Sequence, residues 1–392
     1  MPRPARRIES VPPYLFAEID RKRREVAARG VDVISLGIGD PDLPTPDFVV
    51  ERMAQEIRDP RWHRYPDYEG HPAFRRAVAS FYRRRFGVEI DPDREVLALI
   101  GSKEGLAHLI WAYVDPGDVV LVPDPAYPVY LTQTRLAGGE PYVMPLRRER
   151  GFLPDLGAIP TDVARRAKLL FVNYPNNPTG AVADRAFYEE AVAFCRQHDI
   201  LLVSDNAYSE MTFDGFVAPS ALEVPGARDV TVEFWSLSKP FNMTGWRIAA
   251  AVGNADALYR ALGIVKTNLD SGQFTAIQMA AAAALESPEA EAFIRRMNAV
   301  YARRRDMAVQ ALRRMGLDVE APRGTFYLWV PVPAGHTSTS FATLLLEKAG
   351  VVVTPGIGYG PGGEGYVRLS LCLPDERLQE ALDRMTAQVR IG

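Results

Sequence analysis

The sequence predicts an α/β protein of two domains, a large domain with a mostly parallel sheet covered by helices and a smaller α+β domain. Two observations predict it. Between residues 95 and 252, short apolar runs alternate with helical patterns, which is typical of a parallel sheet buried on both faces. From residue 316 onward, short strands and helices alternate again as a second unit. We expect the large domain at 44–285, and the smaller one at 1–43, with an N-terminal arm, and 286–392.

The N-terminal region begins with a proline-containing arm, and a helix follows over 15–29, ended by Gly30. A short strand over 31–36 leads into Gly37-Ile38-Gly39-Asp40-Pro41. This Gly-x-Gly is not a dinucleotide fingerprint, because Pro41 and Pro44 stand where the helix would have to begin. The two glycines instead let the backbone approach a ligand closely. Helices are expected over 47–58 and 72–86.

The central region carries the strands of the predicted sheet. Apolar, β-branched runs predict them over 95–100, 118–123, 168–173, 200–204, 230–234 and 248–252, with helices between several of them. Ligands bind at the carboxyl ends of such strands. The polar segments that follow the strands are expected at that edge, and they are 101–104, 124–127, 173–180 and 205–208.

The remainder of the chain is expected to be helical first and mixed afterwards. Helices are predicted over 255–262, 273–285 and 288–315. After residue 316 we expect strands over 326–330, 351–354 and 366–371 and helices over 340–349 and 375–388.

Composition excludes several classes of function. A net charge of −3 gives no electrostatic case for binding nucleic acid or an anionic membrane. The five histidines form no ligand pair at metal-binding spacing, so no protein-bound metal is expected. Cys195 and Cys372 lie in apolar contexts and form no disulfide framework. The N-terminus lacks a secretory apolar region and no apolar span of membrane length exists, so a cytoplasmic protein is expected.

The segment 230–253 holds the residue around which the chemistry is organised. Lys239 lies between two buried strands and is followed by Arg247 eight positions later. Only six of the 46 basic residues are lysines, so a lysine kept here indicates a need for its amine. A lysine can form an imine with an aldehyde cofactor, and an arginine can bind a phosphate in a planar fork. The alternative is that Lys239 is an ordinary solvated loop lysine.

Five features converge on the expected strand ends. Gly101-Ser102-Lys103 at a helix N-terminus favours an anion, and Ser236, Ser238 and Arg247 would complete a phosphate cup. Asp205 ends a buried strand and needs a positive partner, for which a protonated pyridine nitrogen is suitable. Asn177 and Tyr208 can hydrogen-bond a phenolic oxygen, and Tyr127 can stack on an aromatic ring. Singly, each has an ordinary structural explanation as a turn, a cap or a packing residue.

Four motifs together resemble one family. DPAYPVY (124–130), NYPNNPTG (173–180), DNAY (205–208) and SLSKPFNMTGWR (236–247) resemble the fold-type I pyridoxal-phosphate enzymes, the class I/II aminotransferases. The resemblance extends over essentially the whole chain. It implies an enzyme of ping-pong mechanism with amino-acid and 2-oxo-acid substrates, and a homodimer with shared active sites.

The resemblance also implies a role for each matching residue. Lys239 would carry the cofactor as an imine and move the proton, Asp205 would pair with the pyridine nitrogen, and Tyr208 and Asn177 would hold the phenolic oxygen. The implied cofactor site comprises Ser102, Lys103, Tyr127, Asn177, Asp205, Tyr208, Ser236, Ser238, Lys239 and Arg247, with Tyr65 lent to the neighbouring subunit's phosphate. The implied substrate site comprises Gly39, Asn177 and Arg368, with Arg368 clamping the α-carboxylate. By pattern alone, Arg368 would be an exposed strand residue and Tyr65 a packing residue.

Further stretches resemble one branch of this family. The segments 11–46, 63–70, 100–109, 152–156 and 268–274 are similar to the LL-diaminopimelate aminotransferases of lysine and peptidoglycan precursor biosynthesis. This resemblance implies 2-oxoglutarate and glutamate as the second substrate pair. Aspartate and alanine aminotransferases are the related alternatives. Tyr14 and Tyr68 are the candidates for contact with the substrate.

Three other interpretations compete with a transaminase. Ser236-Leu237-Ser238-Lys239 and Ser204-Asp205-Asn206 match two parts of the penicillin-recognising serine hydrolase set, but in reversed order and without K-T-G. A pyridoxal-phosphate β-elimination lyase would share Lys239, Asp205 and Arg247. A regulatory binding protein would need a DNA-binding segment, and no helix-turn-helix pattern precedes residue 35.

Overall fold

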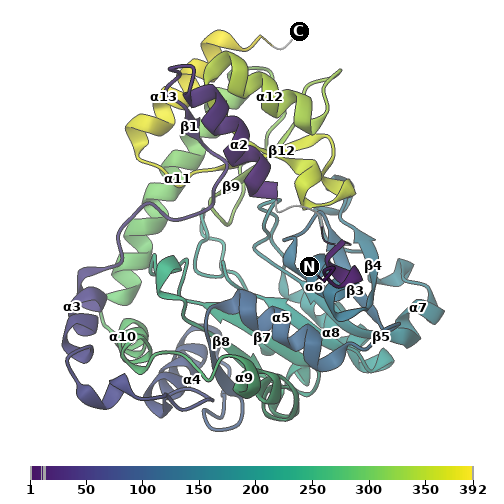
Figure 1. Ribbon diagram of the computed structural model, residues 1–392, viewed down its shortest axis with the longest axis vertical. Coiled ribbons are helices and arrows are strands. Elements are labelled where there is room, and N and C mark those ends of the chain that lie inside the picture. The colour runs from purple at the N-terminus through teal and green to yellow at the C-terminus, as the bar shows by residue number, and fades with distance from the viewer. Residues whose placement is uncertain (1, 10, 12–14, 391–392) are drawn as a thin grey trace.

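The chain forms two lobes joined by one long helix, α11 (Ala290–Arg314), in a computed structural model that describes residues 2–9, 11 and 15–390 (Figure 1). The larger lobe contains a seven-stranded sheet. The smaller lobe contains a three-stranded sheet and a separate pair of short strands. The predicted fold class, a helix-covered and mostly parallel sheet with a smaller α+β unit, is confirmed.

The large sheet has the strand order β2-β8-β7-β6-β5-β3-β4. All neighbouring strands from β7 to β4 run parallel, and β8 runs antiparallel to both β2 and β7. The strands are β2 (Val96–Leu99), β3 (Val119–Asp124), β4 (Glu140–Pro145), β5 (Ala167–Val172), β6 (Leu201–Asp205), β7 (Thr231–Ser236) and β8 (Ala249–Gly253). Every residue of β2, β3, β7 and β8 is buried, which is why these strands were recognisable as continuous apolar runs.

Sequence analysis missed one strand, β4. It lies at the edge of the sheet, and Met144 is its only buried residue. Pro141 and Pro145 interrupt its pattern, which is tolerated at an edge because one side of the strand has no partner. The strand therefore lacks both the apolar run and the alternation by which strands are recognised.

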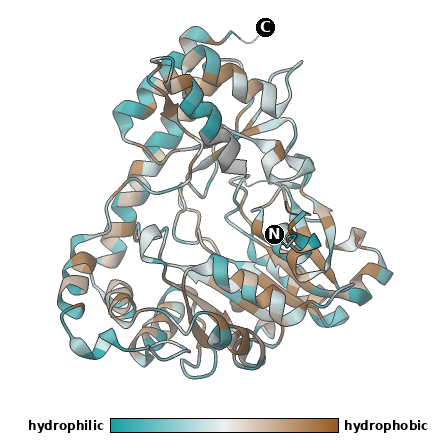
Figure 2. Ribbon diagram, viewed as in Figure 1, coloured by the Kyte–Doolittle hydropathy of each residue, from teal (hydrophilic) through white to brown (hydrophobic). Residues whose placement is uncertain are grey.

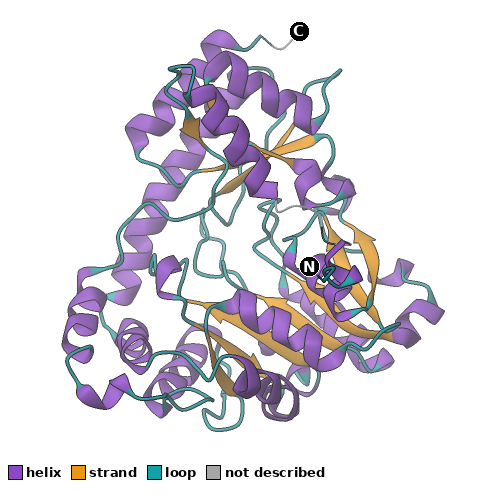
Figure 3. Ribbon diagram, in the orientation of Figure 1, coloured by secondary structure: helices purple, strands orange, loops and turns teal. Residues whose placement is uncertain are grey.

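Helices cover both faces of this sheet, and its strands form the apolar interior (Figures 2 and 3). The predicted helix over 72–86 forms as α4 (Pro72–Phe86), with proline in its first turn and Gly87 ending it at φ 68°. The Asp184 carboxylate caps α8 (Arg185–His198) by accepting a 3.0 Å hydrogen bond from the N–H of Phe187. The others are α3 (Asp47–Glu56), α5 (Ser102–Tyr113), α6 (Val129–Ala137), α7 (Thr161–Arg166), α9 (Gly263–Leu269) and α10 (Thr275–Glu286). A π-helical turn over 257–262 precedes α9.

The smaller lobe combines both ends of the chain (Figure 1). β12 (Tyr366–Ser370) pairs antiparallel with β9 (Tyr327–Pro331) and with β11 (Thr354–Pro355). β1 (Ile34–Ser35) pairs in parallel with β10 (Val351–Val352), which joins the N-terminal segment to this lobe. The helices here are α2 (Leu15–Ala27), α12 (Ser338–Ala349) and α13 (Asp375–Gln388), and the short α1 (Arg6–Glu9) lies elsewhere in the N-terminal region.

A buried arginine reinforces the link between the N-terminal segment and the smaller lobe. Arg304 of α11 forms ion pairs of 2.7 Å with both Asp42 and Asp375, and its side chain is 3% exposed. The division into 44–285 and 1–43 with 286–392 stays a prediction, which this pairing supports. None of the helices in the described part of the chain is long and apolar enough to cross a membrane.

Candidate active site

A cavity of about 380 Å³ lies where the carboxyl ends of the large sheet's strands meet the smaller lobe. Segments from both lobes line it, because β6 and β7 end at it from one side and β12 lies on the other. Most residues predicted for the site line this cavity, namely Gly39, Ser102, Tyr127, Asn177, Asp205, Tyr208, Lys239 and Arg368. The prediction that polar segments at the strand ends come together therefore agrees with the structure.

Lys239 follows β7, and its ammonium nitrogen reaches into the space between the lobes. Nζ donates a 3.2 Å hydrogen bond to the carbonyl of Gly39. The ring centroids of Phe326 and Tyr208 lie 5.4 and 5.9 Å from the same atom. Burial lowers the pKa of Lys239, and the positive charges of Arg368 and Arg247 lower it further. A larger neutral fraction makes this amine a better nucleophile and base than a solvated lysine.

Asp205 ends β6 with one satisfied and one unsatisfied carboxylate oxygen. Oδ2 accepts a 2.6 Å hydrogen bond from the Tyr130 hydroxyl. Oδ1 is buried and has no hydrogen-bond partner among the described residues. Burial raises the pKa of Asp205 to about 6, against the lowering effects of the Tyr130 hydrogen bond and the charge of Lys239. A buried acceptor of this kind fits a cationic N–H donor placed in the cavity.

A hydrogen-bonded turn places Asn177 next to this aspartate. The Asn173 side chain donates a 2.6 Å hydrogen bond to the Asp205 carbonyl and accepts one of 2.9 Å from the N–H of Asn177. The segment 173–180 is thus fixed to the end of β6. This is the physical reason why two motifs about 30 residues apart face the same cavity.

Arg368 is not the exposed strand residue that its pattern suggested. It is 2% exposed, and its guanidinium lies 4.0 Å from the ring centroid of Tyr327 and 4.9 Å from that of Tyr359. Nη1 donates to the Asn177 side-chain oxygen and Nη2 to the carbonyl of Gly37, both at 2.8 Å. Nε is buried without a partner in the described chain. A fixed, desolvated guanidinium lining a cavity is suited to bind a carboxylate.

Three tyrosines to which the sequence assigned no role support the site: Tyr327 and Tyr359 line the cavity, and Tyr130 lies behind Asp205. Tyr130, the last residue of DPAYPVY, holds Asp205 and packs edge-on against Tyr127 with centroids 5.9 Å apart. Tyr327 and Tyr359 flank Arg368, and the Tyr327 hydroxyl lies 3.3 Å from that of Tyr208. The spacing within the motif offered a signal for Tyr130. The other two come from distant strands and loops, and only the fold brings them here.

The glycine at position 39 is required by close packing. A Cβ atom at Gly39 would lie 1.8 Å from the Tyr327 hydroxyl oxygen, so no larger residue fits. The close neighbour of Gly39 in the structure is a tyrosine, and the expected approach of its backbone to a ligand stays a prediction.

Several of the residues predicted for an anion cup lie near the N-terminus of α5. Gly101 precedes the helix at φ 80°, and the Arg247 guanidinium lies so close that a Cβ at Gly101 would be 2.1 Å from Nη2. Burial lowers the pKa of Lys103, and the nearby Arg247 lowers it further. Ser236 ends β7 and Ser238 follows it, both are buried, and Ser236 Oγ accepts a 3.1 Å hydrogen bond from the N–H of Ser238. First-turn N–H groups, hydroxyls and a guanidinium are the groups that bind phosphate in proteins.

Of the other predicted residues, two tyrosines lie away from the cavity and a third lies outside the residues that the structure describes. Tyr65 is 88% exposed and Tyr68 48% exposed, and neither lines the cavity of its own chain. Packing does not explain Tyr65, which corrects the alternative interpretation of that residue. Tyr14 lies outside the described residues.

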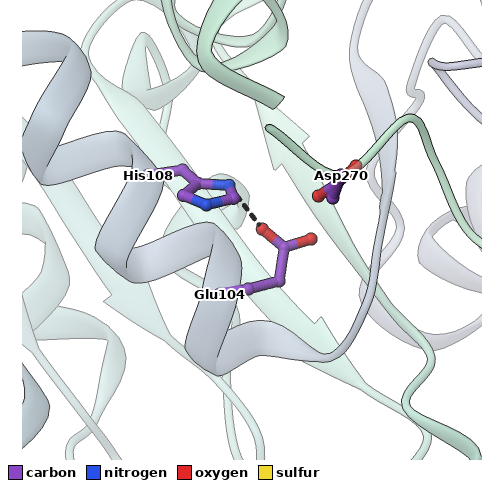
Figure 4. A group of neighbouring side chains, drawn as sticks. All are labelled: Glu104, His108 and Asp270. Carbon is purple, nitrogen blue, oxygen red and sulfur yellow. Dashed lines mark ion pairs between the residues drawn. The ribbon is translucent and has the colours of Figure 1, made fainter. Parts of the chain in front are cut away.

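One carboxylate and imidazole group has a geometry that sequence analysis did not anticipate. Glu104 and His108 lie one turn apart on α5, and Asp270 faces them from the segment after α9 (Figure 4). His108 Nδ1 is 2.9 Å from Glu104 Oε2. The ammonium of Lys266 lies 2.9 Å from Asp270 and 3.3 Å from Glu104. Lys266 therefore supplies the positive charge that a bound cation would otherwise provide.

Comparison with known proteins identifies the family. The family model for aminotransferases of class I and II matches residues 31–385. The chain belongs to this family. Its members depend on pyridoxal phosphate, and the resemblance seen in the motifs is confirmed. The serine hydrolase interpretation is wrong, because the chain belongs to the aminotransferase family and Ser236 is buried at the end of β7.

Individual relatives agree over nearly the full length. The chain is 58% identical over 382 residues to the LL-diaminopimelate aminotransferase of Moorella thermoacetica, covering 97% of each chain. It is 41% identical to a probable N-succinyldiaminopimelate aminotransferase from Thermus thermophilus, whose structure superposes with a TM-score of 0.89 over 95% of this chain and 99% of that one. A Thermus thermophilus aspartate aminotransferase mutant is 33% identical with a TM-score of 0.92, covering 98% and 99%.

The residues at the cavity fit pyridoxal phosphate. The unpaired Oδ1 of Asp205 offers an acceptor for a protonated ring nitrogen. The close contact between Gly101 and Arg247 at the start of α5 provides a cradle for a phosphate. Lys239 lines the same cavity, so its amine and the Asp205 carboxylate can act on one ligand.

Asp205 gives a pH-dependent prediction for the cofactor-free protein. Its pKa is raised from 3.8 to about 6 in the folded chain, so its contribution to stability is present below about pH 4 and is lost as the pH rises through 6. Relative to an Asp205→Asn variant, the free energy of unfolding should fall by about 2 kcal/mol between about pH 4 and pH 7. Denaturant unfolding at both pH values measures this difference. A difference in unfolding free energy between the parent and the variant that is the same at both pH values would contradict the raised pKa of Asp205.

Proposed function

We propose that this protein transfers an amino group between LL-diaminopimelate and 2-oxoglutarate with pyridoxal phosphate as cofactor. The observation that carries the proposal is the single cavity in which an amine of lowered pKa, a half-satisfied buried carboxylate and a desolvated guanidinium face one another. The choice of substrate rests on the 58% identity to the Moorella thermoacetica enzyme over 97% of both chains.

The cofactor would be held at four points. Ser102, Lys103, Ser236, Ser238 and Arg247 would bind its phosphate at the N-terminus of α5. Asp205, kept in place by Tyr130, would pair with its ring nitrogen. Tyr127 would stack on the ring, and Asn177 and Tyr208 would hydrogen-bond its phenolic oxygen. When bound, pyridoxal phosphate supplies an aldehyde that takes up the amino group and a protonated ring that accepts electron density.

The protein's own groups would bind the substrate and move the proton. The guanidinium of Arg368 would bind the α-carboxylate, assisted by the backbone at Gly39 and by Asn177. The Nζ atom of Lys239 would take the proton from the substrate α-carbon, because its lowered pKa increases the neutral fraction of the amine. The rings of Tyr327 and Tyr359 exclude water from the arginine and strengthen its attraction for a carboxylate.

A related substrate class is the second candidate. The 33% identity and TM-score of 0.92 to a Thermus thermophilus aspartate aminotransferase favour a smaller dicarboxylic amino acid. Alanine as donor, and β-elimination on the same cofactor, would use the same set of lysine, aspartate and arginine. These reactions differ in the amino acid that reacts, so measuring the half-reaction with each candidate substrate separates them.

The test follows the visible absorption band of the bound cofactor. LL-diaminopimelate should abolish the band by converting the cofactor to its amine form, and 2-oxoglutarate should restore it. Aspartate, alanine and glutamate at equal concentration provide the comparison, and Lys239→Ala is the matched variant that should not convert. A response to aspartate or alanine but not to LL-diaminopimelate would contradict the substrate. Pyruvate and ammonia formed without an acceptor would indicate a lyase.

We also propose a homodimer in which Tyr65 reaches the phosphate of the neighbouring site. Tyr65 is 88% exposed and does not line the cavity of its own chain. Its loop packs on the segment after α9, where a Cβ at Gly272 would lie 3.1 Å from Asp67 and Pro66. Ile264 and Leu269 of α9, the helix that precedes this segment, are more than half exposed. Exposed apolar side chains of this kind are what a second copy would bury.

Hybrid dimers test the shared site. Tyr65→Ala and Lys239→Ala variants should each be impaired, and an equal mixture refolded together should recover about a quarter of the parental activity, because half the dimers contain one intact site of two. Mixing Lys239→Ala with Arg247→Ala is the matched control, since both residues serve their own chain's site and no intact site forms. Absence of recovery in the first mixture would contradict the proposal.

A further inference from the structure

Lys266 is a fully buried lysine outside the cavity, and the proposed mechanism gives it no role. It lies on α9 and has an exposed fraction of 0%. Its Nζ atom is 2.9 and 3.0 Å from the two oxygens of Asp270 and 3.3 Å from Glu104 Oε1. A buried ammonium between two carboxylates is costly to desolvate, so its ion pairs must be well formed to be tolerated.

Glu104 connects Lys266 to the first half of the anion cup, the turn 100–104. Glu104 lies in the first turn of α5, and its Oε1 accepts a 2.7 Å hydrogen bond from the N–H of Ile100. The carboxylate thereby closes the turn 100–104, which contains Gly101, Ser102 and Lys103. Burial alone would raise the pKa of Glu104, but hydrogen bonding to His108 and the charge of Lys266 lower it, so the carboxylate is ionised.

Asp270 connects Lys266 to the second half of the cup, the segment that carries Arg247. Asp270 Oδ1 accepts a 2.8 Å hydrogen bond from the N–H of Gly272. The next residue, Gln273, donates its side-chain amide to the carbonyl of Arg247. Arg247 has φ 56°, a left-handed conformation that a non-glycine residue adopts only when its surroundings hold it there.

The two halves of the cup are also in direct contact, because the Arg247 guanidinium packs against Gly101. A closed circuit therefore runs from Lys266 through Glu104 and the turn 100–104 to Arg247, and back through Gln273 and Asp270. Figure 4 shows how Glu104 and His108 on α5 and Asp270 on the adjoining segment point toward one another. The ammonium of Lys266 is the only cationic group of that circuit, among the described residues, that ion-pairs with both carboxylates.

We propose that Lys266 is a positioning residue that ties the N-terminus of α5 to the segment carrying Arg247 and so sets the geometry of the phosphate cup. This inference rests on the cup assigned in the proposed function. Lys266 acts through Glu104 and Asp270 and does not itself touch the phosphate. Without its ammonium the two carboxylates repel each other, and the two halves of the cup separate.

The test measures binding of inorganic phosphate to the cofactor-free protein by calorimetry, which does not depend on turnover. Lys266→Met should raise the phosphate dissociation constant by about tenfold, the lower end of what loss of an outer-shell partner costs at metal sites. The dissociation constant of pyridoxal phosphate should rise with it, while turnover at saturating cofactor changes much less. Lys168→Met, an exposed lysine of the same lobe, is the matched control and should bind as the parent does.

A second variant distinguishes loss of the tie from a folding defect. Glu104→Gln combined with Lys266→Met neutralises one of the two carboxylates that Lys266→Met leaves without their ammonium partner, but it does not restore the tie, so this variant should fold and still bind phosphate more weakly. Parental phosphate affinity in either folded variant would overturn the inference. Arg247→Met separates this result from failure of the cup: if Arg247→Met also leaves phosphate binding unchanged, the assigned cup is wrong, and if it weakens binding, only the role of Lys266 is lost.

Discussion

The structure depends on one buried carboxylate that is only half satisfied. Asp205 ends a buried strand, with one oxygen bonded to Tyr130 and the other without a partner among the described residues. An uncompensated acceptor in the interior is unfavourable, and the raised pKa of Asp205 expresses that cost. A cationic ligand that donates a hydrogen bond to Oδ1 removes this energetic cost. In the proposed function, this unsatisfied oxygen is the group that would hold the cofactor's ring nitrogen.

Contact between the two lobes is the second requirement. Arg368 comes from the smaller lobe, and it reaches Asn177 of the large lobe and Gly37 of the N-terminal segment. Three parts of the chain, separated by up to 331 positions, are thus joined by one guanidinium. In the proposed function this guanidinium binds the substrate carboxylate, so substrate binding and lobe contact would be linked. A shift of either lobe would change the hydrogen bonds available to the carboxylate.

The residues that lie in contiguous motifs at strand ends could be predicted from the sequence. Lys239, Asp205 and Asn177 were recognisable because parallel strands carry their ligand-binding loops at one edge, and the strands of the buried sheet are unmistakably apolar. β4 was missed because an exposed edge strand containing prolines lacks that signal. Tyr327, Tyr359 and the Lys266 circuit were missed because their roles arise from contacts between segments far apart in sequence. The burial of Arg368 could not be read from its strand, since alternation does not say which face meets another lobe.

We propose that Asp205 keeps the cofactor's ring nitrogen protonated. The ¹⁵N chemical shift of that nitrogen can be measured in protein reconstituted with ¹⁵N-labelled pyridoxal phosphate, for the parent and for Asp205→Ala. A protonated nitrogen is expected in the parent near neutral pH and an unprotonated one in the variant. An unprotonated nitrogen in the parent, or the same shift in both proteins, would contradict it.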